Sequence, residues 1–169
     1  PDGKLEQFEL RASPECVSVL EWASNPNVSL AFSAKASNKS GSKLEALGYG
    51  DLRLAGGDLF DMGMTETFNP TQYKLTTLDG IEYILNKDFG IQQIKDRNGN
   101  TLQFTRSGIS HSGGWALAFT RDAQGKISKI SGPGGQVLNY GYDAADNLTS
   151  VVDQTNAVSD FRYETAKVA

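Results

Sequence analysis

Few residues in this sequence have the types and spacing that chemistry requires. Residues 110–114 read Ser-His-Ser-Gly-Gly around His111, the one histidine of the chain. A serine nucleophile needs a base within hydrogen-bond reach, and a third group that orients the base. Neighbouring side chains on an extended segment point to opposite faces, so neither serine naturally meets His111. We therefore expect a hairpin loop here, inside an inserted segment at 105–116.

A second candidate is the oxygen-rich stretch 96–100, Asp-Arg-Asn-Gly-Asn. Its alternation of oxygen ligands is typical of a calcium loop, but the twelfth position is Ser107 where an EF-hand has glutamate. A hairpin turn accounts for the same residues, because Asn98-Gly99 suits positive φ and Asp96 can bond to the nearby backbone. The pattern favours the turn.

The remaining candidates are one cysteine and two tryptophans. Cys16 has no second cysteine to pair with, and a single histidine cannot make a two-histidine metal site. We expect Cys16 to be a small buried hydrophobe. Trp22 and Trp115 are candidates for a binding surface, although core packing is the commoner role of tryptophan. The sequence shows no nucleophile–base pair and no cofactor fingerprint, which predicts a non-catalytic protein without a cofactor.

Composition narrows the function classes further. The chain has 169 residues, 38% of them hydrophobic, and a formal net charge of -4. No basic patch is evident, so nucleic acid is a poor partner, and no apolar run approaches the ~20 residues of a membrane span. Glycine occurs 18 times and proline 5 times, which indicates many tight turns. From its first residue, Pro1, and its uncapped end, we expect a piece of a longer polypeptide.

The elements that must position these residues are strands, because the apolar period is two almost everywhere. Alternating runs flank Asp79-Gly80, Asn98-Gly99 and Gly134-Gly135, which predicts hairpins; for Asp79-Gly80 the pattern indicates a type I′ turn. Residues 43–48 fit either one helical turn or a short strand. The sequence therefore predicts an all-β, mostly antiparallel fold.

Two regions differ in character. Residues 1–70 contain short, irregular strand-like runs, which we interpret as an N-terminal cap or lead-in region. Residues 71–169 are more regular and contain a repeat with a constant offset of 21, in which Asp122 aligns with Asp143 and Tyr142 with Tyr163. Each copy is predicted to hold two short strands and a turn, and a weaker copy begins at Asp88. The residues that define the repeat are Asp122, Gly125, Ile127, Tyr140, Tyr142, Asp143, Leu148, Phe161 and Tyr163.

The repeat resembles a known family. Residues 140–153 are similar to the tyrosine–aspartate (YD) repeat of rearrangement-hotspot (RHS) proteins, whose pattern is Tyr-x-Tyr-Asp-x-x-Gly-Arg-Leu, and 96–104 resembles the second half of such a unit. The resemblance covers about 71–163. The Gly-Arg pair of the pattern is Asp146-Asn147 here, and Arg121 stands where Tyr142 stands one repeat later. Nothing matches the self-cleaving core segment of the family, so no catalytic residue is carried over.

The resemblance implies a mechanical role. Similar proteins build a spiralling sheet of hairpins that closes into a hollow shell around a toxin or other C-terminal domain. By this resemblance the chain is a non-catalytic shell segment of a secreted or cell-surface protein, bacterial in origin, and its partners are further repeats and the enclosed domain. Tyr140, Tyr142, Phe161 and Tyr163 would then form cross-strand aromatic ladders. The alternative is an adhesin module that binds carbohydrate or protein through exposed aromatic residues.

Overall fold

The computed structural model describes residues 5–13, 27–34, 41–49, 52–55, 58–61 and 66–164. Strands dominate these residues, which include no α-helix and a single 3₁₀ turn at Pro133–Gly135. Neighbouring strands pair in antiparallel register, and the hairpins follow one another along the chain. The predicted all-β fold of antiparallel hairpin repeats is confirmed. The chain divides into two compact units, residues 1–101 and 102–169.

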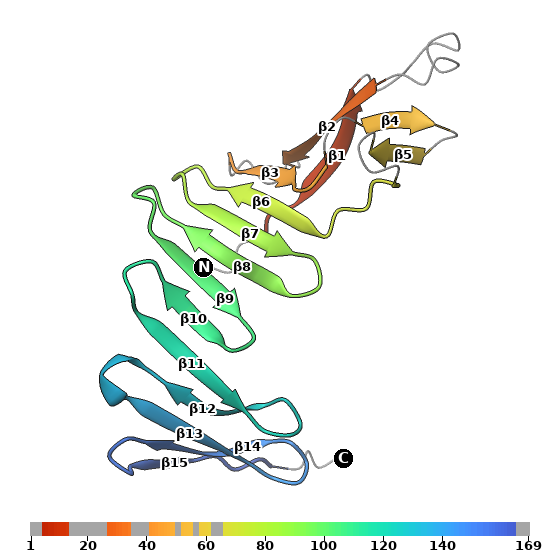
Figure 1. Cartoon of the computed structure of the whole chain (residues 1–169). Helices are drawn as coiled ribbons and strands as arrows, with labels where there is room; N and C mark the ends of the chain where they lie inside the picture. The colour runs from red at the N-terminus through yellow and green to blue at the C-terminus, as the bar shows by residue number, and fades with distance from the viewer. Residues whose placement is uncertain are drawn as a thin grey trace. The chain divides into compact units, whose positions relative to one another are not determined.

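In the first unit the strands follow the spatial order β8-β7-β6-β3-β2-β4-β5, with β1 paired to β2 (Figure 1). Residues 43–48 were compatible with a helical turn or a short strand, and Lys43–Ala46 form strand β3. Strands β6 to β8 form a meander in which each strand pairs with the next, with a register shift between Ile84 and Leu85. The strands are β1 (Phe8–Ser13), β2 (Asn27–Ala34), β3 (Lys43–Ala46), β4 (Leu52–Ala55), β5 (Asp58–Asp61), β6 (Gln72–Thr76), β7 (Glu82–Asn86) and β8 (Gly90–Lys95).

The second unit is a simple meander in which each strand pairs with the next along the chain (Figure 1). Its turns alternate between two edges of the sheet, with 111–115, 132–136 and 153–157 at one edge and 122–126 and 143–147 at the other. The strands are β9 (Thr101–Thr105), β10 (Gly108–His111), β11 (Ala116–Arg121), β12 (Ile127–Ser131), β13 (Val137–Tyr142), β14 (Leu148–Asp153) and β15 (Val158–Asp160).

The 21-residue period extends further upstream than the sequence indicated. The turns that begin at His111, Gly132 and Asp153 are spaced by 21, and in each of them the first amide donates to the carbonyl four residues further on. The β-bulges at Thr120/Arg121 and Gly141/Tyr142 are also 21 apart. The hairpin loop predicted at 110–114 is present as the turn 111–115, but its description as part of an insertion is wrong: β10 lies within 105–116 and pairs with β9 and β11 as part of the regular array.

Very little of the sheet is enclosed. Among the described residues Leu52 is the one buried hydrophobic side chain, at 5% exposure. A sheet normally buries one face against a second layer, because a single face supplies the hydrophobic stabilisation of the fold. The strands described here therefore lack a second layer of their own.

Some expectations fall outside what the structure describes. Cys16 and Trp22 lie outside the described residues. The division into a lead-in region at 1–70 and a repeat region at 71–169 concerns a change in sequence character, and it stays a prediction. No helix in the described ranges is long and apolar enough to cross a membrane.

Candidate functional site

The second unit has one strongly apolar face. Residues directly opposite in an antiparallel pair share a face, and the register pairs Phe119 with Ile130, Ile130 with Leu138 and Tyr140 with Val151. These pairs, extended across β9 and β10, define the apolar face, made up of Phe104, Ile109, Leu117, Phe119, Ile130, Leu138, Tyr140 and Val151. The opposite face carries polar side chains together with smaller apolar ones: Gln103, Ser110, Thr120, Lys129, Ser131 and Asn139, and Ala116, Ala118, Val137, Val152 and Val158.

This apolar face is open to solvent. Leu117 is 40% exposed and Leu138 is 37% exposed. Together with Ile130 they line an open groove of ≈ 330 Å³. Burying apolar surface contributes about 25 cal/mol per Å², so the face is a strong candidate for covering by further protein.

The first unit repeats this division of faces. The register places Tyr73 opposite Leu85, and Leu75 opposite both Tyr83 and Leu44. The opposite face carries charges: Lys43 and Lys74 both pair with Glu45, at 2.9 and 3.0 Å, in a cluster that is partly exposed. The hydrogen bonds from the two lysines lower the pKa of Glu45. Exposed ion pairs of this kind contribute little to stability, but they indicate that this face of the sheet is the solvent side.

Four turns of the array, at 96–100, 122–126, 143–147 and 153–157, share one five-residue geometry. In the turn 143–147, the amides of Ala145 and Asn147 both donate to Oδ1 of Asp143, at 2.9 Å. The Asp143 amide donates to the Asn147 carbonyl, and the Asp146 amide to the Asp143 carbonyl. Aspartates at 96, 122 and 153 accept the same two amide hydrogen bonds from positions two and four residues further on.

The fourth residue of each turn takes positive φ. Gly99 has φ 86° and Gly125 has φ 85°, whereas Asp146 and Asn156 adopt φ 69° and 65° without a glycine. This is a type I turn followed by a left-handed residue. The predicted type I′ turn at Asp79-Gly80 is wrong, because positive φ occurs at Gly80 and not at the residue before it. At the first position of this turn, Thr77 Oγ1 accepts the Ile81 amide, and this hydrogen bond stabilises the type I turn.

Hydrogen bonding lowers the pKa of three of these capping carboxylates. The side-chain hydrogen bond from Asn100 lowers the pKa of Asp96. The backbone amide of Asn147 does the same for the pKa of Asp143, and the Thr155 hydroxyl for that of Asp153. Each bond favours the charged form because a carboxylate accepts more strongly than a carboxylic acid.

A second repeated bond ties each hairpin to the one before it. The Tyr142 hydroxyl donates to the Ile127 carbonyl at 2.8 Å, and the Tyr163 hydroxyl donates to the Leu148 carbonyl at 2.9 Å. Both bonds reach back 15 residues. Arg121 takes the place of the tyrosine one repeat earlier and makes the same kind of bond. Its Nε donates to the carbonyl of Arg106, again 15 residues earlier, at 3.1 Å.

One edge of the second unit carries an additional ionic contact. Lys126, in the turn 122–126, forms an ion pair with Asp146 in the turn 143–147. Its ammonium also lies 4.9 Å from the centroid of the Tyr142 ring. Asp146 raises the pKa of Lys126 through their hydrogen bond. The tyrosine hydroxyl and this lysine therefore connect successive copies at the same edge.

The predicted aromatic ladder is not formed by the described rings. Tyr140 faces Val151 and Tyr142 faces Leu148 across the β13–β14 pair. One repeat spans two strands, so equivalent residues are separated by about 9–10 Å, twice the strand spacing. Aromatic contacts need centroids within about 7 Å. Aliphatic residues therefore separate the rings, and Phe161 and Tyr163 remain 43% and 58% exposed.

The candidate catalytic residues do not form a catalytic arrangement. Ser110 pairs across strands with Gln103, and His111 with Leu102, so their side chains occupy opposite faces. The Nδ1 atom of His111 instead accepts the Gly113 amide at 2.9 Å. Trp115 closes the same turn and is 63% exposed.

The calcium interpretation of 96–100 is also not supported by the geometry. Oδ1 of Asp96 accepts the amides of Asn98 and Asn100, both at 2.8 Å, and its Oδ2 accepts the Asn100 side chain. These donors would repel a cation. No cluster of three or more acidic, histidine or cysteine side chains suited to a metal occurs in the described part of the chain.

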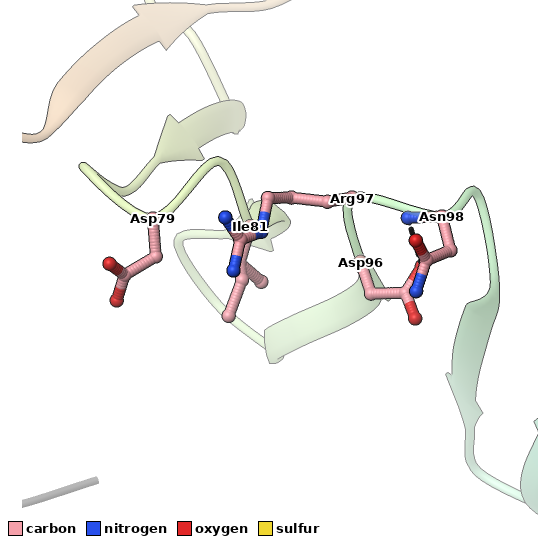
Figure 2. Close-up of a pocket in the computed structure, with 5 residues that line it drawn as sticks. All are labelled: Asp79, Ile81, Asp96, Arg97 and Asn98. Carbon is pink, nitrogen blue, oxygen red and sulfur yellow. Dashed lines mark hydrogen bonds between the residues drawn. The ribbon is translucent and has the colours of Figure 1, made fainter.

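The same turn borders an open hollow of ≈ 700 Å³ between the turns 77–81 and 96–100 (Figure 2). The Arg97 side chain extends from one turn toward the other, and its Cγ is 3.2 Å from where a Cβ on Gly80 would lie. Asp79 and Ile81 complete the lining with the residues of the 96–100 turn. The hollow is wide, and the Asp96 carboxylate at its border accepts amides of its own turn. We therefore describe it as a surface depression.

The fold and the turns define the class of protein: an array of antiparallel β-hairpins with capped turns and a 21-residue period. The family model for the RHS repeat matches residues 113–158, the segment where that period is most regular. This segment is therefore similar to the RHS repeat, as the resemblance implied. A search of curated proteins finds no match to the chain.

Sequence reasoning did not detect two functional details of this array. The capping role of His111 was missed, although Gly114 three residues later carries the signal of the other turns. The turn at Asp153 was missed as well, because Asn156 replaces the glycine at its fourth position.

Proposed function

We propose that this chain is a structural segment of an RHS/YD-repeat shell that encloses or presents a toxin or effector domain in a secreted or cell-surface protein. The observation that carries the proposal is the uncovered apolar face of the second unit, with Leu117 and Leu138 at 40% and 37% exposure. Repeats of this kind are stable when neighbours add a continuous layer, since one hairpin cannot bury its face.

The partners that fit this face are the remainder of the polypeptide: further repeats and an enclosed domain. The polar side of the first unit, with its Lys43–Glu45–Lys74 cluster, suits the solvent side of such a wall. The turns and the tyrosine hydrogen bonds supply rigidity and leave the apolar side chains free for packing. No catalytic step is assigned to the chain.

Limited proteolysis of the full-length gene product tests this proposal. We expect a domain outside the repeats to resist cleavage in the native protein and to become sensitive when mild denaturant opens the shell. Equal cleavage of that domain in both conditions would rule out enclosure.

A second candidate function is a binding module, which the 63% exposure of Trp115 at a turn favours. An exposed indole is a common contact for glycans and for partner proteins. Glycan-array binding that Trp115→Ala abolishes would support it. Phe89→Ala is the matched control, because Phe89 is also an exposed ring at a turn, at 82%. Equal binding by both variants and the wild-type chain would exclude a role for Trp115.

A further inference from the structure

The turn 111–115 uses a histidine where the other capped turns of the second unit, 122–126, 143–147 and 153–157, use aspartate. Its backbone closes as they do: the His111 amide donates to the Trp115 carbonyl at 2.7 Å, and the Gly114 amide to the His111 carbonyl at 3.0 Å. Gly114 has φ 88°, like the fourth residue of the other turns. The difference lies in the cap, because the Gly113 amide donates to an imidazole nitrogen.

This hydrogen bond fixes the state of the imidazole. A backbone N–H can only donate, so the Nδ1 atom that accepts it carries no proton. Accepting at Nδ1 is the geometry of the tautomer that carries its proton on Nε2. A protonated imidazole has no acceptor and would present an N–H to the Gly113 amide at 2.9 Å.

We propose that protonation of His111 uncaps the turn 111–115, so that this turn and Trp115 form a pH-sensitive element in an array whose other caps hold at the same pH. Histidine is the side chain whose ordinary titration falls between pH 5 and 8. The carboxylate caps at 96, 143 and 153 remain charged there, because hydrogen bonds lower their pKa. Such an element would operate whether or not the chain forms part of a shell.

On the two strands that pair with β10, no charged side chain lies opposite His111 to replace the lost bond. Its partner on β9 is Leu102, and β9 carries no titratable residue. The pairs of β10 with β11 involve Ala116, Leu117 and Ala118, and the charged residue of β11, Arg121, bonds at the far edge.

The glycine beside the imidazole makes the contact tight. A Cβ on Gly113 would lie 2.9 Å from Nδ1 of His111 and 3.6 Å from Cδ1 of Trp115. The imidazole and the indole therefore flank the same backbone segment. A change in the cap should be visible at both the Gly113 amide and the Trp115 ring.

Amide NMR of the ¹⁵N-labelled chain between pH 7.5 and 5.5 tests the proposal. We expect the Gly113 resonance to move over this range and its protection from exchange, corrected for pH, to fall about two- to tenfold, as the loss of one hydrogen bond implies. The internal control is the amide of Ala145, which holds the equivalent position in the aspartate-capped turn 143–147 and should not move.

Two variants complete the test. His111→Asp installs the cap of the other turns, and His111→Asn installs the amide that already caps Asp88 and Phe89 through Asn86. Both should abolish the pH response of Gly113 and of Trp115 fluorescence in a Trp22→Phe background. A Gly113 amide that stays constant in the wild-type chain, or a response that persists in the two variants, would overturn the proposal.

Discussion

At the scale of single residues, the array depends on side chains that bond to the backbone. Asp143 and its counterparts hold the turns, and Tyr142 and Tyr163 hold each hairpin to the preceding one. These bonds recur at the 21-residue period of the array. They explain how a sheet with one buried hydrophobic side chain among its described residues can keep a regular shape.

The tyrosine bond can be tested with a conservative pair of variants. Tyr142→Phe leaves the Ile127 carbonyl without its donor, and we expect a loss of about 0.5–1.5 kcal/mol in unfolding free energy. Tyr140→Phe is the matched control, because Tyr140 lies on the same strand and face. Urea denaturation measures both. Equal losses in the two variants would show that the Tyr142 hydroxyl contributes nothing specific.

Gly108 tests the close approach of two strands. A Cβ there would lie 2.1 Å from the Leu117 carbonyl oxygen, and the residue has φ 155°. We expect Gly108→Ala to cost more than about 2 kcal/mol, because backbone must move to admit the methyl group. Gly135→Ala, at φ 82° with no atom within 4 Å, should cost only the strain of positive φ, about 1–2 kcal/mol. The melting temperature should therefore fall further in Gly108→Ala than in Gly135→Ala, and the reverse order would contradict the close packing of β10 on β11.

At the scale of elements, the caps make the turns sensitive to strong acid. The folded pKa of Asp143 is lowered, so its stabilising contribution is complete above the ordinary aspartate range and is lost as pH falls through the folded pKa. We expect the urea midpoint of the wild-type chain to decline below about pH 5. Asp143→Asn keeps the acceptor oxygen and removes the titration, so its midpoint should fall less steeply. A decline as steep as that of the wild-type chain would exclude Asp143 as a source of the acid sensitivity.

Much of the array was predictable from the residues, and the errors have physical causes. Alternation of apolar and polar residues identified the hairpins, and the offset of 21 identified their period. The turn type was wrong because Asp79-Gly80 suggested a two-residue loop, whereas Thr77 caps a three-residue loop. The aromatic ladder was wrong because one repeat holds two strands, which places Tyr142 against Leu148.

Other features of the site were not accessible to pattern reading. Arg121 breaks the tyrosine pattern in the sequence, yet it reaches the same backbone position as a tyrosine would. His111 stands alone in the sequence, and only the paired strands show that it occupies an aspartate's place. A side chain of different chemistry can make an equivalent bond, and a residue pattern does not record this.

At the scale of the whole molecule, the central feature is a sheet with two unlike faces. In the second unit the apolar face is open, and the opposite face carries polar residues such as Lys129 and Asn139. Such a face promotes self-association when nothing covers it. If the rest of the polypeptide covers this face, the apolar side chains become part of the hydrophobic layer that the sheet lacks.

The most direct test is the accessibility of the two faces. In a Cys16→Ser background, Leu138→Cys places a thiol on the apolar face and Asn139→Cys places one on the opposite face of the same strand. We predict that a maleimide labels both in the 169-residue chain, whereas in the full-length gene product Leu138→Cys is protected and Asn139→Cys still reacts. Equal labelling of Leu138→Cys in the chain and in the full-length product would contradict the claim that this face is covered.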